Sequence, residues 1–267
     1  MSAAPAWVAA ARARAQRPPR VPRLPLRVAG QAVGSVEPGI LDEIASKGLL
    51  DKRYKLSKDE REGWSLHAPG EATPALDALA QALRAQGRCG PWRNEQLAVC
   101  DAQGRRIGTI ERGAVRPLGL ATQAVHLVAR APDGHMWVQL RAFDKPNNPG
   151  QWDTLMGGMV SAADTLPQAL ARETWEEAGL RVEALRGVAH GGHVRLAVPS
   201  EEAHGCGYMV ERIDWFHATV PEGVAPVNQD GEVERFELLA PQALLERLAQ
   251  GAFTPEAALV LAAALGF

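Results

Sequence analysis

Apolar residues follow two different spacings along this chain, and each spacing predicts a different kind of element. Leu76, Leu79 and Leu83 recur every three to four residues, which predicts a helix over Ala75–Gln86. The run Ala124–Ala131 is rich in Val and Leu and predicts a buried strand. By the same criteria we expect a hairpin over Leu26–Val36, strands over Glu95–Asp101, Arg106–Glu111, Met136–Arg141, Val182–His190, Met209–Val220 and Arg235–Leu239, and helices over Ala6–Gln16, Gly39–Lys47, Leu166–Ala178, Pro241–Ala249 and Pro255–Leu265.

These elements predict an α+β fold in two domains. Strands and helices alternate without a strict βαβ rhythm, so we expect a mixed sheet flanked by helices. The elements up to residue 112 are enough for a small N-terminal α+β domain (1–112), which leaves 113–267 for the larger one.

Composition and charge exclude several classes of protein. The net charge is −2, so no overall field favours nucleic acid. No apolar run is long enough to span a bilayer, and the three cysteines form no CxxC pair. The first 36 residues hold six arginines and no acid, but the Ala- and Arg-rich style continues along the chain, so we interpret it as compositional bias. We therefore expect a cytoplasmic protein with neither a membrane nor a nucleic-acid partner.

The predicted helix Leu166–Ala178 changes character halfway along one face. Leu166 and Leu170 lie on the same stripe as Glu173 and Glu177, and the three glutamates 173, 176 and 177 fall within an arc of about 100°. Carboxylates this close repel each other unless a positive charge lies between them. A hard divalent cation with oxygen ligands fits that role, so this face is expected to meet a cavity.

The spacing around this helix resembles the Nudix hydrolase signature. Five residues separate Gly158 from the acid Asp164, and seven more precede the run Arg172–Glu173–Thr174–Trp175–Glu176–Glu177, which is followed by Gly179–Leu180. The chain departs from that pattern twice, because Asp164 replaces the usual glutamate and Thr174 stands at an apolar position. The resemblance implies a Nudix α/β/α sandwich that hydrolyses a diphosphate linkage.

The resemblance also implies the roles of individual residues. Glu173 and Glu177 would bind Mg²⁺ or Mn²⁺, Glu176 would bind a second ion or hold a water, the Gly158 carbonyl would add an oxygen ligand, and Arg172 would orient the glutamates. A further acid often completes such sites from outside the helix.

Residues outside the signature supply the remaining candidates. Glu232 and Glu234 are two choices for the further acid, with a plain acidic turn as the alternative. Arg141 and Lys145 are candidates for phosphate contacts, and Trp152 for stacking on a substrate ring, although surface and core roles are also open to them.

Blocks upstream of the signature resemble one branch of this family. They are Trp92–Glu95, Ile110–Gly119 and Ala124–Leu127, which are similar to Nudix proteins that carry a small N-terminal domain, including the Nudix part of fungal thiamine pyrophosphokinase. That branch implies thiamine diphosphate, or its oxidised oxo and oxy analogues, as substrate. The alternatives are a nucleoside diphosphate-X pyrophosphatase and a ligand-sensing module without turnover. The partner is then a small-molecule diphosphate, and a homodimer is one assembly left open.

Overall fold

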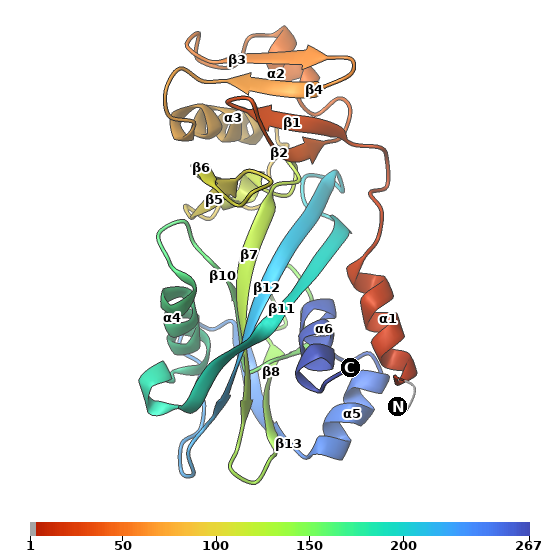
Figure 1. The fold of residues 1–267 in the computed structure, drawn as a ribbon, viewed down its shortest axis with the longest axis vertical. Helices are drawn as coiled ribbons and strands as arrows, with labels where there is room; N and C mark the ends of the chain where they lie inside the picture. Colours follow the sequence, from red (N-terminus) through yellow and green to blue (C-terminus); the bar gives the residue numbers. More distant parts are fainter. Residues whose placement is uncertain (1–3) are drawn as a thin grey trace.

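The computed structural model describes residues 4–267, and they form a small upper sheet above a larger lower one (Figure 1). The upper part has a four-stranded sheet in the order β2-β1-β4-β3 and a separate two-stranded ribbon of β5 and β6. Its elements are β1 (Leu24–Val28), β2 (Gln31–Val36), α2 (Asp42–Ser46), β3 (Lys55–Asp59), β4 (Gly63–His67), α3 (Thr73–Ala85), β5 (Gln96–Cys100), β6 (Arg106–Glu111) and the short helix η1 (Arg112–Ala114).

The lower part is built around a seven-stranded mixed sheet. Its main order is β11-β12-β7-β8-β13, with β10 paired to β7 and β9 paired to β8. The β12–β7 pair is parallel and its neighbours are antiparallel. Its elements are β7 (Ala121–Arg130), β8 (Met136–Arg141), β9 (Trp152–Asp153), β10 (Met156–Met159), α4 (Leu166–Ala178), η2 (Val182–Ala184), β11 (Arg186–Ser200), β12 (Gly207–Thr219), β13 (Val233–Leu239), α5 (Pro241–Ala249) and α6 (Pro255–Ala264).

Helices cover both faces of the lower sheet, as Figure 1 shows for α4 on one side and α5 and α6 on the other. Val125 and Leu127 of β7 pack in one apolar cluster with Leu170 of α4. The alternate residues Ala124 and Val128 pack in another cluster with α5 and α6. A strand buried on both faces is apolar at nearly every position, which is why the sequence pattern located β7. The predicted mixed sheet flanked by helices is confirmed.

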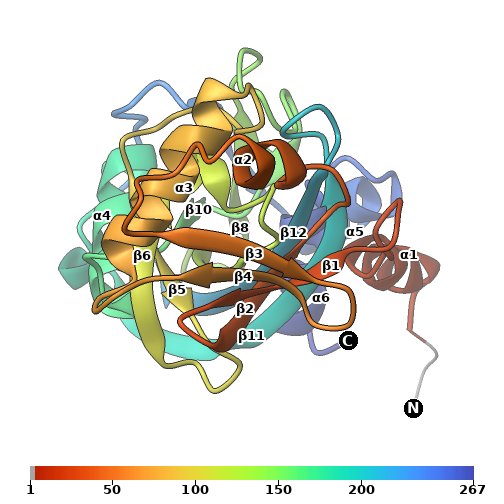
Figure 2. The same ribbon diagram turned by 90° about the horizontal axis from the view of Figure 1, so that it is seen from above.

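The N-terminal helix α1 (Ala6–Ala15) packs on the lower part, not on the small upper sheet (Figures 1 and 2). Trp7 contacts Phe267 edge to face, with ring centroids 5.9 Å apart, and Gln16 bridges to Ala197 of β11. The chain then runs to the upper sheet through its proline-rich segment. The boundary at residue 112 stays a prediction, but the segment before β1 is placed with the second half.

The structure corrects the predicted strand Val182–His190 at both ends. Residues 182–184 form the short helix η2, and β11 continues beyond His190 to Ser200. A Cβ added at Gly191 would lie 1.9 Å from the Trp215 ring of the paired strand, so this glycine permits close packing. Strands β3 and β4 were not predicted, because Lys55–Asp59 is a mostly polar edge strand with little apolar alternation.

Within residues 4–267, no helix combines the length and apolar character that crossing a bilayer requires.

Candidate functional site

The acidic helix α4 begins and ends at well-defined residues that fix its position against the sheet. The backbone N–H of Thr165 donates to Gln168 Oε1 at 2.9 Å, and Pro167 occupies the first turn, where its missing N–H is not needed. The helix ends at Gly179, whose φ of 62° is left-handed. Leu170 is buried against the sheet, and the glutamates follow it toward the C-terminal end, where the face opens onto a cavity.

Arg172 connects the acids of this region. Its Nη1 donates to Glu173 Oε1 at 2.8 Å and to Glu176 Oε2 at 3.0 Å. On its other edge, Nε and Nη2 both donate to Asp164 Oδ2, at 3.0 and 2.8 Å. Asp164 therefore reaches the guanidinium despite being one methylene shorter than the glutamate of the family pattern. Hydrogen bonds on both edges of the Arg172 guanidinium group therefore fix its orientation.

Glu177 is buried and Glu173 is partly buried on the side of the helix that faces the sheet and the cavity. Glu177 is 3% exposed and accepts hydrogen bonds from the Gly157 N–H at 3.0 Å and from Gln139 Nε2 at 2.9 Å. Burial raises the pKa of Glu177 to about 8 and the pKa of Glu173 to about 7. Two neighbouring acids that burial discourages from ionising become stable anions when a cation binds between them.

Gly158 leaves the space that Glu173 uses. A Cβ built on Gly158 would lie 2.1 Å from Glu173 Cδ, so any larger residue must displace this carboxylate. The Thr174 side chain is also fully buried, but its hydroxyl has no hydrogen-bond partner, so this departure from the family pattern adds nothing to the site.

Gly158→Ala is expected to lower turnover by about 10- to 100-fold while the fold is kept, because the Cβ moves Glu173 away from its position. The measurement is steady-state phosphate release together with circular dichroism. Gly223→Ala is the control for turnover alone, since a Cβ there meets nothing within 4 Å, while its φ of 80° is expected to cost this variant some stability. A Gly158→Ala rate equal to that of the wild type would show that the position of Glu173 does not matter.

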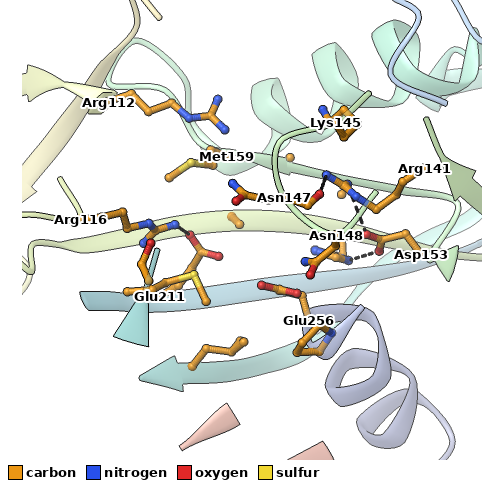
Figure 3. A pocket seen from close by; sticks show the side chains of 18 of the residues that line it. Arg112, Arg116, Arg141, Lys145, Asn147, Asn148, Asp153, Met159, Glu211 and Glu256 are labelled. Atoms are coloured by element: carbon orange, nitrogen blue, oxygen red, sulfur yellow. Dashed lines mark hydrogen bonds and ion pairs between the residues drawn. The ribbon is translucent and has the colours of Figure 1, made fainter. Parts of the chain in front are cut away.

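A cavity of about 770 Å³ extends from α4 to α6 and to the segment that joins the two sheets. Figure 3 shows several of its charged side chains converging from different elements. One side carries Glu173, Glu176 and Glu177 together with Gly157 and Gly158. Gly158 and the three glutamates are the residues that the sequence predicted for the metal site. The apolar part of the lining is Leu196, Val198, Met159 and Met209.

The other predicted site residues are divided between the cavity lining, the exposed surface and the core. Arg141, Lys145 and Glu232 line the cavity, and Lys145 forms an ion pair with Glu232. Glu234 is exposed at a register shift in β13 and is not in the lining. Trp152 is 9% exposed, lies outside the lining and packs against the guanidinium groups of Arg235 and Arg247, so its ring is in the core.

Several residues of the cavity were not predicted as site residues from the sequence. Glu211 accepts a hydrogen bond from Arg116 Nη2 at 2.8 Å, and Asp153 lies 3.6 Å from both Arg141 and His126. His126 is buried and bonds to Thr154 Oγ1 at 2.9 Å; burial lowers its pKa. Others include Arg93, Glu95, Arg112 and Glu256. Arg93, Glu95, Arg112, Arg116 and His126 fall within the blocks that resemble the thiamine-related branch, which was the available signal.

The donors of this cavity fit a hard divalent cation in chemistry. In the described part of the chain, no three acid, histidine or cysteine side chains are already grouped to hold a metal ion, because Arg172 Nη1 lies between Glu173 and Glu176. Glu173 and Glu177 nevertheless supply buried carboxylate oxygens next to Gly158, which is the ligand type that Mg²⁺ prefers. Glu176 could supply a further carboxylate oxygen if its hydrogen bond from Arg172 Nη1 were broken.

Stabilisation by Mg²⁺ is expected to grow with pH. The folded pKa values of Glu173 and Glu177, about 7 and about 8, lie above the ordinary value. Their contribution to metal-free stability is complete below the unfolded pKa near 4.5 and is lost as pH rises through 7 to 8. Protons compete with the ion, so the Mg²⁺-induced rise in Tm should be larger at pH 8.5 than at pH 6. An equal rise at both pH values would contradict metal binding by these acids.

Comparison with known proteins agrees with this geometry. A family model described as the NUDIX domain matches residues 120–259. The chain is 36% identical over 92 residues to an uncharacterized Nudix hydrolase, PA4841, of Pseudomonas aeruginosa, covering 34% of this chain and 54% of that protein. It is 28% identical over 179 residues to the chloroplastic Nudix hydrolase 24 of Arabidopsis thaliana, covering 65% and 48%. The chain thus spans about half the length of these two curated relatives.

Two further similarities are to an isomerase and to a solved structure of the same fold. An isopentenyl-diphosphate Delta-isomerase of Leifsonia xyli is 30% identical over 171 residues, covering 60% of this chain and 86% of that protein. The crystal structure of DR0079 from Deinococcus radiodurans superposes with a TM-score of 0.50 at 20% identity, covering 65% of this chain and all of that one, which shows the fold alone. Because the NUDIX model covers more than half of the 267 residues, this chain belongs to the Nudix family.

Proposed function

We propose that this protein is a metal-dependent hydrolase that cleaves a diphosphate linkage. The observation that carries the proposal is the pair of acids on α4, buried Glu177 and partly buried Glu173, which opens onto a cavity that also carries Arg112, Arg141 and Lys145. Negative ligands for a cation and positive side chains for phosphate oxygens are thus present in one cavity.

The residues divide the work of the reaction. A bound Mg²⁺ or Mn²⁺, held by Glu173, Glu177 and in part Glu176, would supply charge neutralisation and a more acidic bound water. Arg141 and Lys145 contact the phosphate oxygens and fix their position. Arg172 holds Glu173 and Glu176 in place through its two hydrogen bonds. The products are a monophosphate and the second phosphate-containing fragment.

The proposed substrate is thiamine diphosphate or one of its oxidised oxo or oxy analogues, giving the monophosphate and inorganic phosphate. Its support is the location of the blocks that resemble the thiamine-related branch. Arg93, Arg112, Arg116 and His126 all belong to these blocks, and all four line the cavity. These residues therefore belong to the same cavity as the acids of α4.

Other functions compete with this one. A nucleoside diphosphate-X pyrophosphatase would use the same acids with a different organic group, and a sensing module would bind without turnover. The similarity to the Leifsonia isomerase adds isomerisation of an alkenyl diphosphate, which needs proton transfer to and from carbon. The apolar part of the lining, including Met159 and Met209, is the feature that favours this third reading.

The test is a substrate panel with purified protein and Mg²⁺. We expect inorganic phosphate from oxidised thiamine diphosphate and no AMP from ADP-ribose, with Glu177→Gln as the inactive control. Isopentenyl diphosphate is included, with its isomerisation followed by NMR. Formation of AMP and ribose 5-phosphate from ADP-ribose alone would support the nucleotide enzyme, isomerisation alone would support the isomerase, and no reaction with any member would overturn the proposed hydrolase.

A further inference from the structure

One acid of the cavity has no partner of its own. Glu256 lies in the first turn of α6, after Thr254 and Pro255, and Figure 3 shows its carboxylate directed away from the helix into the cavity. Its Oε2 atom is buried and accepts no hydrogen bond. Among residues 4–267, no basic side chain forms an ion pair with it. The Oε2 atom of Glu256 is therefore a buried acceptor without a donor.

Two cations that line the cavity with Glu256 are already bound to other acids. Arg116 pairs with Glu211 at 2.8 Å, and Arg141 lies 3.6 Å from Asp153. Asp153 also accepts from the Thr254 hydroxyl at 3.3 Å. Burial first, and then the charges of Glu211 and Asp153, raise the pKa of Glu256 to about 7. Three acids therefore line this wall of the cavity, and two of them, Glu211 and Asp153, have a cationic partner.

A buried carboxylate without a donor is costly, because it loses its water and gains nothing in return. Such a group is kept where a ligand supplies the missing hydrogen-bond donor or positive charge. Arg14 and Arg17 also line the cavity, but neither is within ion-pair distance of Glu256 in the described residues. The donor is therefore expected from the ligand itself.

Glu256 lies where we expect the organic group of a substrate, and not where we expect its phosphates. The acids that would hold the metal come from α4, and α6 covers the opposite face of the sheet (Figure 1). Leu196, Val198 and Met209 belong to the same cavity and offer apolar contacts to a ring. An apolar surface with one unpaired acid suits a flat heteroaromatic group that bears positive charge or N–H donors.

We propose that Glu256 is a specificity-determining residue that selects diphosphates whose organic group is cationic or carries an N–H donor. This inference rests on the proposed diphosphate hydrolase and narrows its substrate class. An uncharged alkenyl group would leave the carboxylate unpaired and would be bound less favourably. The selection acts on the organic group alone, so phosphate binding is independent of Glu256.

The test measures binding of products, which undergo no turnover. Thiamine monophosphate carries a cationic ring and an amino group, whereas isopentenyl monophosphate carries neither. Dissociation constants are measured by calorimetry with Mg²⁺ present, for the wild type, for Glu256→Gln and Glu256→Ala, and for the control Glu222→Gln. Glu222 is exposed and lies outside the cavity.

We expect both Glu256 variants to bind thiamine monophosphate on the order of 10-fold or more weakly and isopentenyl monophosphate within about 2-fold of the wild type. Unchanged binding of thiamine monophosphate, or equal losses for both probes, would overturn the proposal. So would a wild type that binds isopentenyl monophosphate as tightly as thiamine monophosphate. Thermal unfolding without ligand checks that each variant is folded. Failure of the proposed hydrolase is seen separately, as no reaction with any diphosphate in the panel.

Discussion

Glu177→Gln is expected to lower turnover by on the order of 10³-fold or more while the protein stays folded. The side chain is 3% exposed and is held by the Gly157 N–H and by Gln139 Nε2. The amide oxygen of glutamine can accept the same two hydrogen bonds, so the local geometry is kept. What is lost is one negative charge in the group of acids that would hold the metal. The loss therefore falls on catalysis and not on packing.

The same substitution is expected to stabilise the metal-free protein. Burial raises the folded pKa of Glu177 to about 8, above its ordinary value, so at pH 8.5 the folded wild type must carry a buried charge. The stability lost by the wild type as pH rises through 8 is not lost by the variant. Metal-free Glu177→Gln should therefore have a higher Tm than the wild type at pH 8.5, with little difference near pH 5.

Three measurements check this prediction: phosphate release, Tm without metal at pH 5 and pH 8.5, and the rise in Tm on adding Mg²⁺. We expect the variant to lose most of the Mg²⁺-induced rise. Glu183→Gln is the matched control, because it removes the same charge from an exposed position just after α4. A variant that hydrolyses its substrate at nearly the wild-type rate would remove Glu177 from the proposed machinery.

The acids on α4 were found from the sequence because all of them lie on one short segment. Periodicity places Glu173, Glu176 and Glu177 on one side of a helix, and the spacing of Gly158 and Asp164 is equally local. The helices α3, α4 and α5 and the buried strand β7 were located for the same reason. Local pattern therefore identified one wall of the cavity.

The opposite wall depends on contacts between distant segments. Glu211 meets Arg116 across 95 positions of the chain, and the Thr254 hydroxyl meets Asp153 across 101. Glu256 reads as an ordinary acid in the first turn of a helix, where the helix dipole favours one. Only the parallel pairing of β12 with β7, and the packing of α6 on that sheet, bring these residues into the cavity. No periodicity encodes such a pairing.

Helix α1 illustrates the same limit on the scale of a domain. Its sequence predicted a helix, and a helix is present, but its partner Phe267 is the last residue of the chain. A boundary drawn at residue 112 from the predicted elements assigns the helix by its order along the chain. Packing assigns it instead by where its apolar side chains are buried.

Arg116→Met is expected to destabilise the protein by about 3–5 kcal/mol. The Arg116 and Glu211 side chains are only 10% and 7% exposed, and Arg116 also donates to Thr122 Oγ1 at 3.0 Å. Removing the cation leaves Glu211 charged and without its main partner inside the protein. This is more costly than losing an exposed ion pair, because water cannot replace the missing partner.

The pH dependence of the variant gives the prediction a second readout. In the wild type, burial by itself would raise the pKa of Glu211, but the charge and hydrogen bond of Arg116 and the Thr122 hydroxyl lower it overall. The wild-type contribution is thus present above the unfolded pKa and lost as pH falls through the folded one. In Arg116→Met, burial raises the pKa instead, so the contribution is lost as pH rises.

Urea unfolding at pH 5 and pH 8 measures both effects. Arg53→Met is the matched control, because Arg53 pairs with Asp51 on the surface, where the two side chains are 71% and 46% exposed, and its loss should cost far less than the loss of Arg116. Adding Glu211→Leu to Arg116→Met removes the unpaired charge and should restore much of the stability, with the pH dependence abolished. If the double variant were instead as unstable as Arg116→Met at both pH values, the cost would come from lost packing of the arginine stem and not from a buried charge left alone.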